Sequence, residues 1–403
     1  MPRKKAMSRG ANGTGSIRKK TVVRNGKDYI YWEARCTVGY DSRTGKQIQR
    51  SVSGPTQKEV ARRMKEISVE VDQGTYLAPS KMTVAEWLTI WQRDFLNNVK
   101  ASTSFLYGEN IRLYIDPVLG FIKLEALNTH TIQSFYNDLY KPHKNGQNPL
   151  SAKTIKNIHG VLHKALQQAV AIGYLRFNPS DACSLPRVIQ KEIHPLDEVQ
   201  VSAFLSAVTG HVHEHLYKID MFTGMREGEI LGLTWDCVDL AKGTVQIRQQ
   251  LRREQKKGGK YYFSPPKNNK SRILTLAPSV LQAFRSQKIK QTEMQLYAGG
   301  DWNNEHNLIF TNETGGFLSY RTVYDCFKRI VASIGTPTTR FHDLRHTYAV
   351  AAIQSGDDIK TVQENLGHAT AAFTLDVYGH VTAHMKQESA NRMELFIQSV
   401  SGD

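Results

Sequence analysis

The sequence predicts a multidomain α+β fold: a three-stranded β-sheet with one helix, a four-helix all-α unit, and a mainly α unit with a small β-sheet. Three observations carry this prediction. A chain of 403 residues is too long for one ordinary core. Segments rich in β-forming residues cluster at the beginning, before about residue 55. From residue 82 onward, apolar residues recur mostly at helical spacing.

The first 75 residues form the predicted β-domain. Residues 1–15 are basic and rich in glycine, so we expect them to be disordered until an acidic partner orders them. Strands are predicted over residues 16–23, 27–40 and 47–52, with turn signals between them. Thr56 has the sequence context of an N-cap for a helix that ends near residue 71, because Glu59 follows it by three positions.

Residues 81–186 form the predicted helical domain. Thr83 is the expected N-cap of its first helix, and proline at position 117 is expected to end its second. The apolar and aromatic side chains at this spacing are interpreted as core. The four predicted helices cover residues 83–99, 102–114, 129–140 and 151–172.

Residues 195–403 form the third predicted domain, which is mixed. Strands are expected over residues 244–253, 272–276 and 307–310, and two helices are expected to carry the stretch from His342 to His380. A final helix is expected over residues 383–399. The remaining predicted helices cover residues 197–208, 215–223, 224–233, 278–295 and 320–334.

The chain is strongly basic, with a net charge of +16 and a pI near 9.5. Residues 1–75 contain 17 Lys and Arg against 7 Asp and Glu, so most of the excess lies there. This balance favours a polyanionic partner, nucleic acid first and an anionic membrane second, over a merely solvated surface. The sheet could also be a protein-interaction module. The basic residues expected to face nucleic acid are Arg18, Lys19, Arg35, Arg50, Lys100, Lys153 and Lys156.

Several functional classes are not indicated. The four cysteines are scattered, which predicts neither disulfides nor a zinc site. No apolar run reaches the roughly 18 residues of a membrane span, and no secretory signal is evident. Nucleotide-binding glycine motifs and clustered acidic residues are not found, so we expect no cofactor and no metal. These features predict a soluble protein of the cytoplasm, without a membrane partner.

The stretch from His342 to His380 holds a group of residues suited to phosphodiester chemistry. His342 and Arg345 are three apart, so a helix would place them on one face, and His368 and Tyr378 follow. Attack on a phosphodiester builds negative charge that fixed guanidinium groups stabilise. The phenol of Tyr378 needs a nearby imidazole or positive charge to become a nucleophile. Upstream, Arg226 begins a predicted helix.

A lysine in a flexible hairpin could protonate the leaving oxygen. Lys267 is the preferred candidate, while Lys260 and Lys270 of the same hairpin remain alternatives. Glu229, three residues after Arg226, is expected to buttress the site. Tyr348 is expected to pack rather than to attack.

Four segments resemble the tyrosine recombinase, or phage-type integrase, family: TGMREGEILGLTWDCVDL, PPKNNKSRILTL, FHDLRHTYAV and ENLGHATAAFTLDVYGHV. The resemblance covers nearly the whole chain and is nearest to integrases of conjugative transposons and temperate phages. It implies that residues 1–75 bind arm-type DNA sites, 81–186 bind the core site and 195–403 are catalytic. The implied catalytic residues are Arg226, Lys267, His342, Arg345, His368 and Tyr378.

The resemblance also implies a mechanism and partners. Arg226 and Arg345 would bind the scissile phosphate, Lys267 would act as general acid, His342 as acid or base and His368 as a hydrogen-bond donor. Tyr378 would form a 3′-phosphotyrosine bond, without metal or ATP. The implied partners are double-stranded attachment sites, three further copies in a homotetramer with the C-terminal helix docking in trans, and an excisionase or DNA-bending protein.

Two alternatives use the same residues. A type IB topoisomerase-like enzyme would share the chemistry but act alone, and the separate N-terminal domain favours the recombinase. A non-catalytic DNA-binding regulator is disfavoured because all six motif positions are intact.

Overall fold

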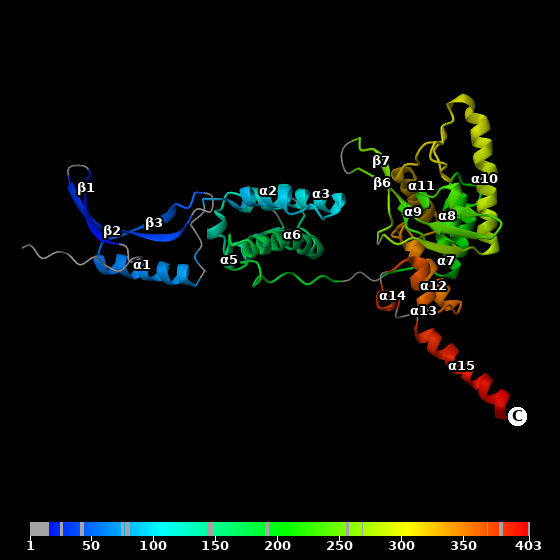
Figure 1. The fold of residues 1–403 in the computed structure, drawn as a ribbon. Coiled ribbons are helices and arrows are strands. Elements are labelled where there is room, and N and C mark those ends of the chain that lie inside the picture. Colours follow the sequence, from blue (N-terminus) through cyan, green and yellow to red (C-terminus); the bar gives the residue numbers. More distant parts are fainter. Residues whose placement is uncertain are drawn as a thin grey trace, which may run out of the picture. The chain divides into compact units, whose positions relative to one another are not determined.

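The chain divides into two compact units, Met1–Ile189 and Gln190–Asp403, in the computed structural model (Figure 1). The structure describes residues 16–24, 27–40, 44–73, 76, 81–142, 148–189, 193–254, 258–267, 269–368, 370–378 and 382–401. For some of these residues it describes the backbone and not the side chain: Arg24, Lys27, Phe373 and residues 376–378 and 382–389.

The first unit begins with an antiparallel sheet in the order β1-β2-β3. Helix α1 packs on one face of this sheet, where Ala34, Cys36 and Val52 form a small core with Val60 and Ile67. The side chain of Thr56 accepts a hydrogen bond from the Glu59 backbone, which confirms the predicted N-cap. The elements are β1 (Ile17–Arg24), β2 (Lys27–Tyr40), β3 (Gln47–Gly54) and α1 (Gln57–Asp72).

The basic residues predicted on this sheet lie on both of its faces. Arg18 and Arg35 are exposed on the face opposite α1. Lys19 and Arg50 are one residue out of phase with them, so they share the face that α1 covers. The Arg50 guanidinium donates a hydrogen bond to the Tyr76 hydroxyl at 3.4 Å. The four residues therefore do not share one face of the sheet, and their contact with DNA stays a prediction.

The helical part of the first unit has its own core, built around Trp87 and Trp91. Thr83 and Glu86 form a capping box at the start of α2, as predicted. Lys100, Lys153 and Lys156 are exposed on α3 and α6 or at their ends. The elements are α2 (Val84–Asp94), α3 (Ala101–Asn110), η1 (Ile111–Ile115), α4 (Asp116–Leu119), η2 (Leu124–Ala126), α5 (Thr129–Tyr140) and α6 (Ala152–Ala171).

The prediction that Pro117 ends the second helix is wrong. A π-helical segment, η1, changes the hydrogen-bond register between α3 and α4. Pro117 then lies in the first turn of α4, where a backbone N–H has no partner within the helix. The helical rod therefore continues to Leu119 and buries Ile111, Ile115 and Leu119.

The second unit packs helices around two small sheets, with order β4-β5-β8 and β6-β7. Its core centres on aromatic side chains of α7, α8, α10 and α11, among them Phe204, Tyr217, Phe284 and Phe327. The elements are α7 (Glu198–Val208), α8 (Glu214–Thr223), α9 (Glu227–Leu231), η3 (Trp235–Cys237), β4 (Val238–Asp239), β5 (Thr244–Ile247), β6 (Gln250–Arg253), β7 (Tyr261–Ser264), β8 (Arg272–Thr275), α10 (Pro278–Ala298), η4 (Gly299–Asp301), α11 (Tyr320–Ser333), α12 (Asp343–Gln354), α13 (Ile359–Leu366), α14 (Ala371–Tyr378) and α15 (Thr382–Ser401).

Three sequence predictions in this unit need correction. The strand expected over 244–253 is two strands, β5 and β6, in different sheets. β6 leaves the first sheet because it packs closely against the end of α9, where a Cβ on Gly232 would lie 2.5 Å from the Leu251 nitrogen. Residues 307–310 form only an isolated bridge, since the amides of Gln287 and Gln291 donate to their carbonyls in place of a neighbouring strand. The stretch from 342 to 380 holds three helices, α12, α13 and α14.

Among the described helices, none combines the length and apolar character that crossing a membrane requires.

Candidate active site

Arg226 follows a tight connection between α8 and α9. Gly224 ends α8 in the left-handed conformation, with φ of +60°. A Cβ at this position would lie 2.5 Å from a ring carbon of Tyr348, so both the conformation and the space require glycine. Arg226 is the N-cap of α9, two residues later. The Thr-Gly-Met-Arg sequence thus fixes the position of the Arg226 backbone, from which the guanidinium extends.

Arg345 lies in the first turn of α12 and is only 2% exposed. Its Nη1 donates to the Gly224 carbonyl at 2.6 Å, and its Nη2 donates to the Leu366 carbonyl at 2.5 Å. The buried guanidinium is therefore bound by backbone from two distant parts of the chain. Tyr348, three residues later, packs against Ala349 and its neighbours and accepts a hydrogen bond from Asn365, as expected of a packing residue.

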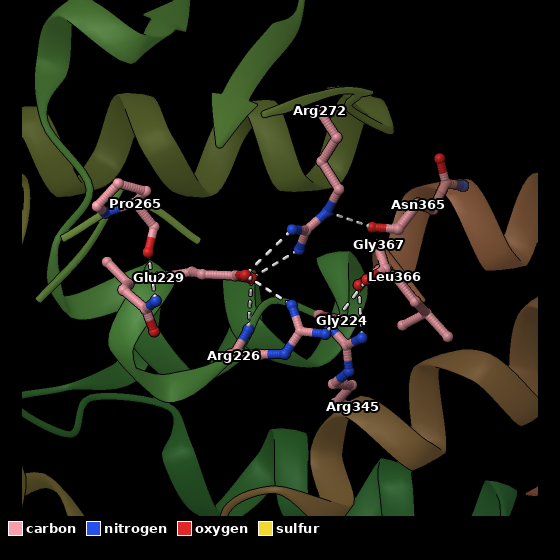
Figure 2. A network of polar contacts seen from close by, with 10 residues as sticks. Gly224, Arg226, Glu229, Pro265, Arg272, Arg345, Asn365, Leu366 and Gly367 are labelled. Carbon is pink, nitrogen blue, oxygen red and sulfur yellow. Dashed lines mark hydrogen bonds and ion pairs between the residues drawn. The ribbon is translucent and has the colours of Figure 1, made fainter. Parts of the chain in front are cut away.

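The C-terminal turn of α13 gathers three arginines (Figure 2). The last carbonyls of a helix lack partners within the helix and carry partial negative charge. Arg272 donates to the Asn365 carbonyl at 2.7 Å and Arg345 to that of Leu366. Arg226 donates to the Gly367 carbonyl at 3.3 Å. Three successive carbonyls thus bind three guanidinium groups from three separate elements.

Glu229 links two of these arginines. Its side chain is fully buried and accepts from Arg226 Nη1 at 2.8 Å, Arg272 Nη1 at 3.1 Å and Arg272 Nη2 at 2.6 Å. The Arg226 backbone N–H donates to the same carboxylate at 3.0 Å. Burial alone would raise the pKa of Glu229, but the hydrogen bonds and charges of Arg272 and Arg226 hold it at about 2. Glu229 therefore buttresses Arg226, as the sequence suggested.

Three histidines lie close to these arginines. Burial lowers the pKa of His342 and His346 to about 4 each, and that of His368 to about 3. The positive charge of Arg345 adds to the decrease of the pKa at all three rings. His342 is exposed to solvent as a whole residue, so burial acts on its ring less than on the other two. All three imidazoles are consequently neutral at pH 7, each able to donate one hydrogen bond and accept another.

These depressed pKa values predict a pH-dependent stability. The unfolded chain binds a proton at each histidine near the ordinary value of 6.5, whereas the folded protein does not. The free energy of unfolding should therefore fall as the pH drops below about 6.5 and continue to fall toward pH 4. Thermal melts between pH 7.5 and 5 should show this slope, and His368→Asn should flatten it. A slope that His368→Asn leaves unchanged would contradict the depressed pKa; His130→Asn, at an exposed position of α5, controls for the substitution.

Two further acidic residues lie behind the arginines. Asp220 of α8 is 1% exposed, and both of its carboxyl oxygens lack a hydrogen-bond partner in the described part of the chain. Burial and the nearby charge of Glu227 raise the pKa of Asp220 well above its ordinary range, against the opposing charge of Arg345. Burial raises the pKa of Glu227 to about 7. Burial therefore favours the protonated form of Asp220, which weakens its attraction to the charge of Arg345.

The candidate lysines differ in their placement. Lys267 is exposed on the loop between β7 and β8. Lys270, farther along this loop, lines a cavity of about 520 Å³ whose wall also includes Arg226, Arg272 and His368. Lys260 is exposed just before β7. The structure thus brings Lys270 beside the arginines, while Lys267 remains the choice that rests on the motif.

Tyr378 is the last residue of α14, and its side chain lies outside the described part of the structure. The start of this helix is nevertheless tied to the site. Thr374 is fully buried, and its hydroxyl lies 3.0 Å from His368 Nδ1. Thr374 precedes Tyr378 by four residues in α14. The contact therefore connects His368 with the helix that carries the predicted nucleophile.

Of the predicted residues, the structure brings Arg226, His342, Arg345 and His368 together, and sequence reasoning missed Arg272 and Thr374. The segment RILTL contained a signal for Arg272. Side chains two apart in a strand lie on the same face, so Arg272 shares the face of the buried Leu274 and is directed toward the interior. Thr374 gave no comparable signal.

Metal binding has one superficial candidate, the His-x-His-x-His run from His211 to His215. Within the residues that the structure describes, no group of three or more His, Cys, Asp or Glu side chains is arranged to hold a metal ion.

Comparison with known proteins defines the class. Residues 195–385 match the model of the phage integrase family, and residues 83–140 match that of the phage integrase N-terminal SAM-like domain. A tyrosine recombinase XerC-like protein of Caldanaerobacter subterraneus is 28% identical over 398 residues, covering 94% of this chain and all of that protein. The ICEBs1 integrase of Bacillus subtilis is 22% identical, covering 90% of this chain and 96% of its own length.

Solved structures share the fold. The Tn1549 transposon integrase in complex with transposon right end DNA has a TM-score of 0.65 at 23% identity, covering 78% of this chain and all of that one. A lambda integrase dimer bound to a core site has a TM-score of 0.53 at 20% identity, covering 89% of this chain and 95% of that one.

The matched family models and relatives are those of tyrosine recombinases. The chain belongs to the phage integrase family. It is a site-specific DNA recombinase of the kind that mobile elements encode.

Proposed function

We propose that this recombinase integrates and excises its mobile element by cutting each DNA strand with Tyr378 and holding the 3′ end as a phosphotyrosine. The observation that carries this proposal is the convergence of Arg226 and Arg345 on the α13 turn that precedes His368. Guanidinium groups from two distant segments, beside a neutral imidazole, suit one phosphodiester. The energy of the broken phosphodiester bond is retained in the phosphotyrosine bond, so rejoining the strands requires no ATP.

In this mechanism the two arginines bind the non-bridging oxygens of the scissile phosphate. His368 donates a hydrogen bond to the same phosphate, and His342 takes the phenolic proton of Tyr378 or returns it. A neutral imidazole at pH 7 is able to accept that proton. Lys267 protonates the 5′-oxygen as it leaves. The products are a 3′-phosphotyrosine and a free 5′-hydroxyl. In the rejoining step, a 5′-hydroxyl of the partner strand attacks the phosphotyrosine phosphorus and releases Tyr378.

The remaining parts of the chain would bind DNA and other copies. Residues 1–75 would bind arm sites through the open face of the sheet, with Arg18 and Arg35, and residues 81–186 would bind the core site through Lys100, Lys153 and Lys156. Separate hydrophobic clusters in these two segments support two domains. Cutting four strands requires a homotetramer; a lambda integrase tetramer bound to a Holliday junction shares this fold. An excisionase or DNA-bending protein would set the direction.

Helix α15 supports assembly of several copies. Met393, Phe396, Ile397 and Val400 recur at helical spacing and are all exposed. Such an apolar stripe favours burial against another surface. We infer that α15 docks on a neighbouring copy within the tetramer.

Covalent trapping tests the proposed nucleophile. We expect the full chain, mixed in EDTA with a duplex of the element's end sequence nicked beside the cleavage position, to form a protein–DNA adduct. Tyr378→Phe should form none, because it lacks the attacking oxygen while keeping the ring. Denaturing electrophoresis separates adduct from free protein. An adduct that persists in Tyr378→Phe would refute the assignment of the nucleophile.

The adduct assay, combined with assays of supercoil relaxation, end joining and DNA binding, separates the alternatives. Tyr348→Phe is the matched control, since that tyrosine packs beside Gly224, and it should retain the adduct. A protein that relaxes supercoils but never joins two distinct ends would instead be the topoisomerase-like enzyme. No adduct with any variant, together with sequence-specific binding, would indicate the non-catalytic regulator.

A further inference from the structure

Arg272 donates hydrogen bonds both to the Glu229 carboxylate and to a backbone carbonyl at the end of α13. Its Nη1 and Nη2 bind both oxygens of Glu229 as a fork, and its Nε donates to the Asn365 carbonyl. The side chain is 10% exposed, so these contacts are made largely out of water. Forked guanidinium–carboxylate pairs combine strength with fixed geometry.

The first consequence concerns charge. Glu229 is buried and ionised, and it also contacts Arg226. If Arg226 were the sole partner of this carboxylate, the pair would carry no net charge. With Arg272 included, the hydrogen-bonded set keeps one net positive charge. A phosphodiester under attack gains negative charge, so this excess stabilises the transition state more than the ground state.

The second consequence concerns position. Gly367 ends α13 in the left-handed conformation, with φ of +64°, and a Cβ there would lie 3.1 Å from Arg272 Nη1. Arg272 therefore packs against the residue directly before His368, while its Nε binds the carbonyl two residues before that glycine. The Arg272 side chain therefore contacts the turn at the end of α13 at two points, the Asn365 carbonyl and Gly367.

We propose that Arg272 is a positioning residue for strand cleavage: it shares the Glu229 carboxylate so that the charge of Arg226 is left for the DNA phosphate, and it holds the turn that presents His368. This inference rests on the proposed function, because it assumes that Arg226 and His368 act on a phosphate. Arg272 itself acts through these two residues.

Charge sharing makes a specific prediction for paired substitutions. Arg272→Gln leaves the buried Glu229 with Arg226 as its guanidinium partner, and we expect single-turnover cleavage at saturating protein to fall about tenfold to a hundredfold. Arg272→Gln combined with Glu229→Gln removes the unbalanced carboxylate and should recover at least about threefold over the single variant. Arg272→Lys keeps the charge without the fork and should fall between wild type and Arg272→Gln.

The pH profile supplies a readout that a purely structural role would not change. In Arg272→Gln, Glu229 loses its strongest stabilising partner, so acid should protonate it and free Arg226. The cleavage rate relative to wild type should therefore rise as the pH falls from 8 toward 6, and the double variant should show no such rise. Arg321→Gln, at an exposed ion pair of α11, is the matched control and should cleave as the wild type does.

The assay uses the full chain and the nicked duplex described above, with thermal melts to verify folding. Loss in Arg272→Gln, recovery in the double variant and the relative rise in acid would support the inference. Cleavage by Arg272→Gln within about twofold of wild type, or a double variant no faster than the single one, would overturn it. If the wild type itself forms no adduct, the proposed function fails instead, so the two failures are distinguishable.

Discussion

Replacing Arg345 with lysine should lower the rate of strand cleavage by about 10²–10³, because the forked guanidinium is a donor fixed where charge develops. A lysine ammonium has a single nitrogen and is unable to bind the Gly224 and Leu366 carbonyls as the two Nη atoms do. One of these buried carbonyls would then lack its partner, at a cost of about 1–3 kcal/mol of folding free energy. Single-turnover adduct formation and thermal melting measure the two effects separately.

The matched control for this change is Arg340→Lys. Arg340 forms an ion pair with Asp343 just before α12, and its side chain is 60% exposed. The Arg340 end of the pair is exposed and lysine keeps its charge beside the buried Asp343, so cleavage should stay within about threefold of wild type. Equal losses in both variants would show that Arg345 acts through the fold of α12 and not on the phosphate.

Lys267→Met should lower cleavage by about 10²–10⁴ on an ordinary phosphodiester, the range expected for loss of a general acid. The loss should disappear when the 5′-bridging oxygen is replaced by sulfur, because a thiolate leaves without being protonated. Lys270→Met should cleave the ordinary and the sulfur-bridged substrates about as the wild type does, since the motif assigns the proton to Lys267.

The structure makes this comparison decisive, because Lys270 and not Lys267 lines the cavity with Arg226 and His368. If Lys270→Met shows the loss that sulfur repairs, the general acid is Lys270. If neither variant depends on the bridging atom, proton donation comes from another group, and the motif assignment of both lysines is wrong.

The fold class and most of the arginine–histidine site could be predicted from the sequence, since local patterns determine them. Apolar spacing and cap residues such as Thr56 and Thr83 place helices because the hydrogen bonds they predict are local. Motif spacing was sufficient for Arg226 and Arg345, which stand next to glycine turns or helix starts.

What the sequence could not predict depends on contacts between distant segments. The split of the strand before β6 follows from close passage under α9, and the continuation through Pro117 follows from a π-helical turn. Arg272 was missed because its partners, Glu229 and Asn365, lie on other elements. Period-two spacing placed it inward but gave no information on what it would meet there.

The row of carbonyls at the end of α13 has a consequence for how the enzyme is switched on. Because backbone carbonyls already bind the three guanidinium groups, the part of the site proposed to bind the phosphate is assembled before any substrate arrives. The proposed nucleophile, Tyr378, belongs to a different helix, α14, which is joined to this part through the His368–Thr374 contact. We therefore expect that a neighbouring copy that shifts α14 would stop strand cutting while the three arginines keep their contacts.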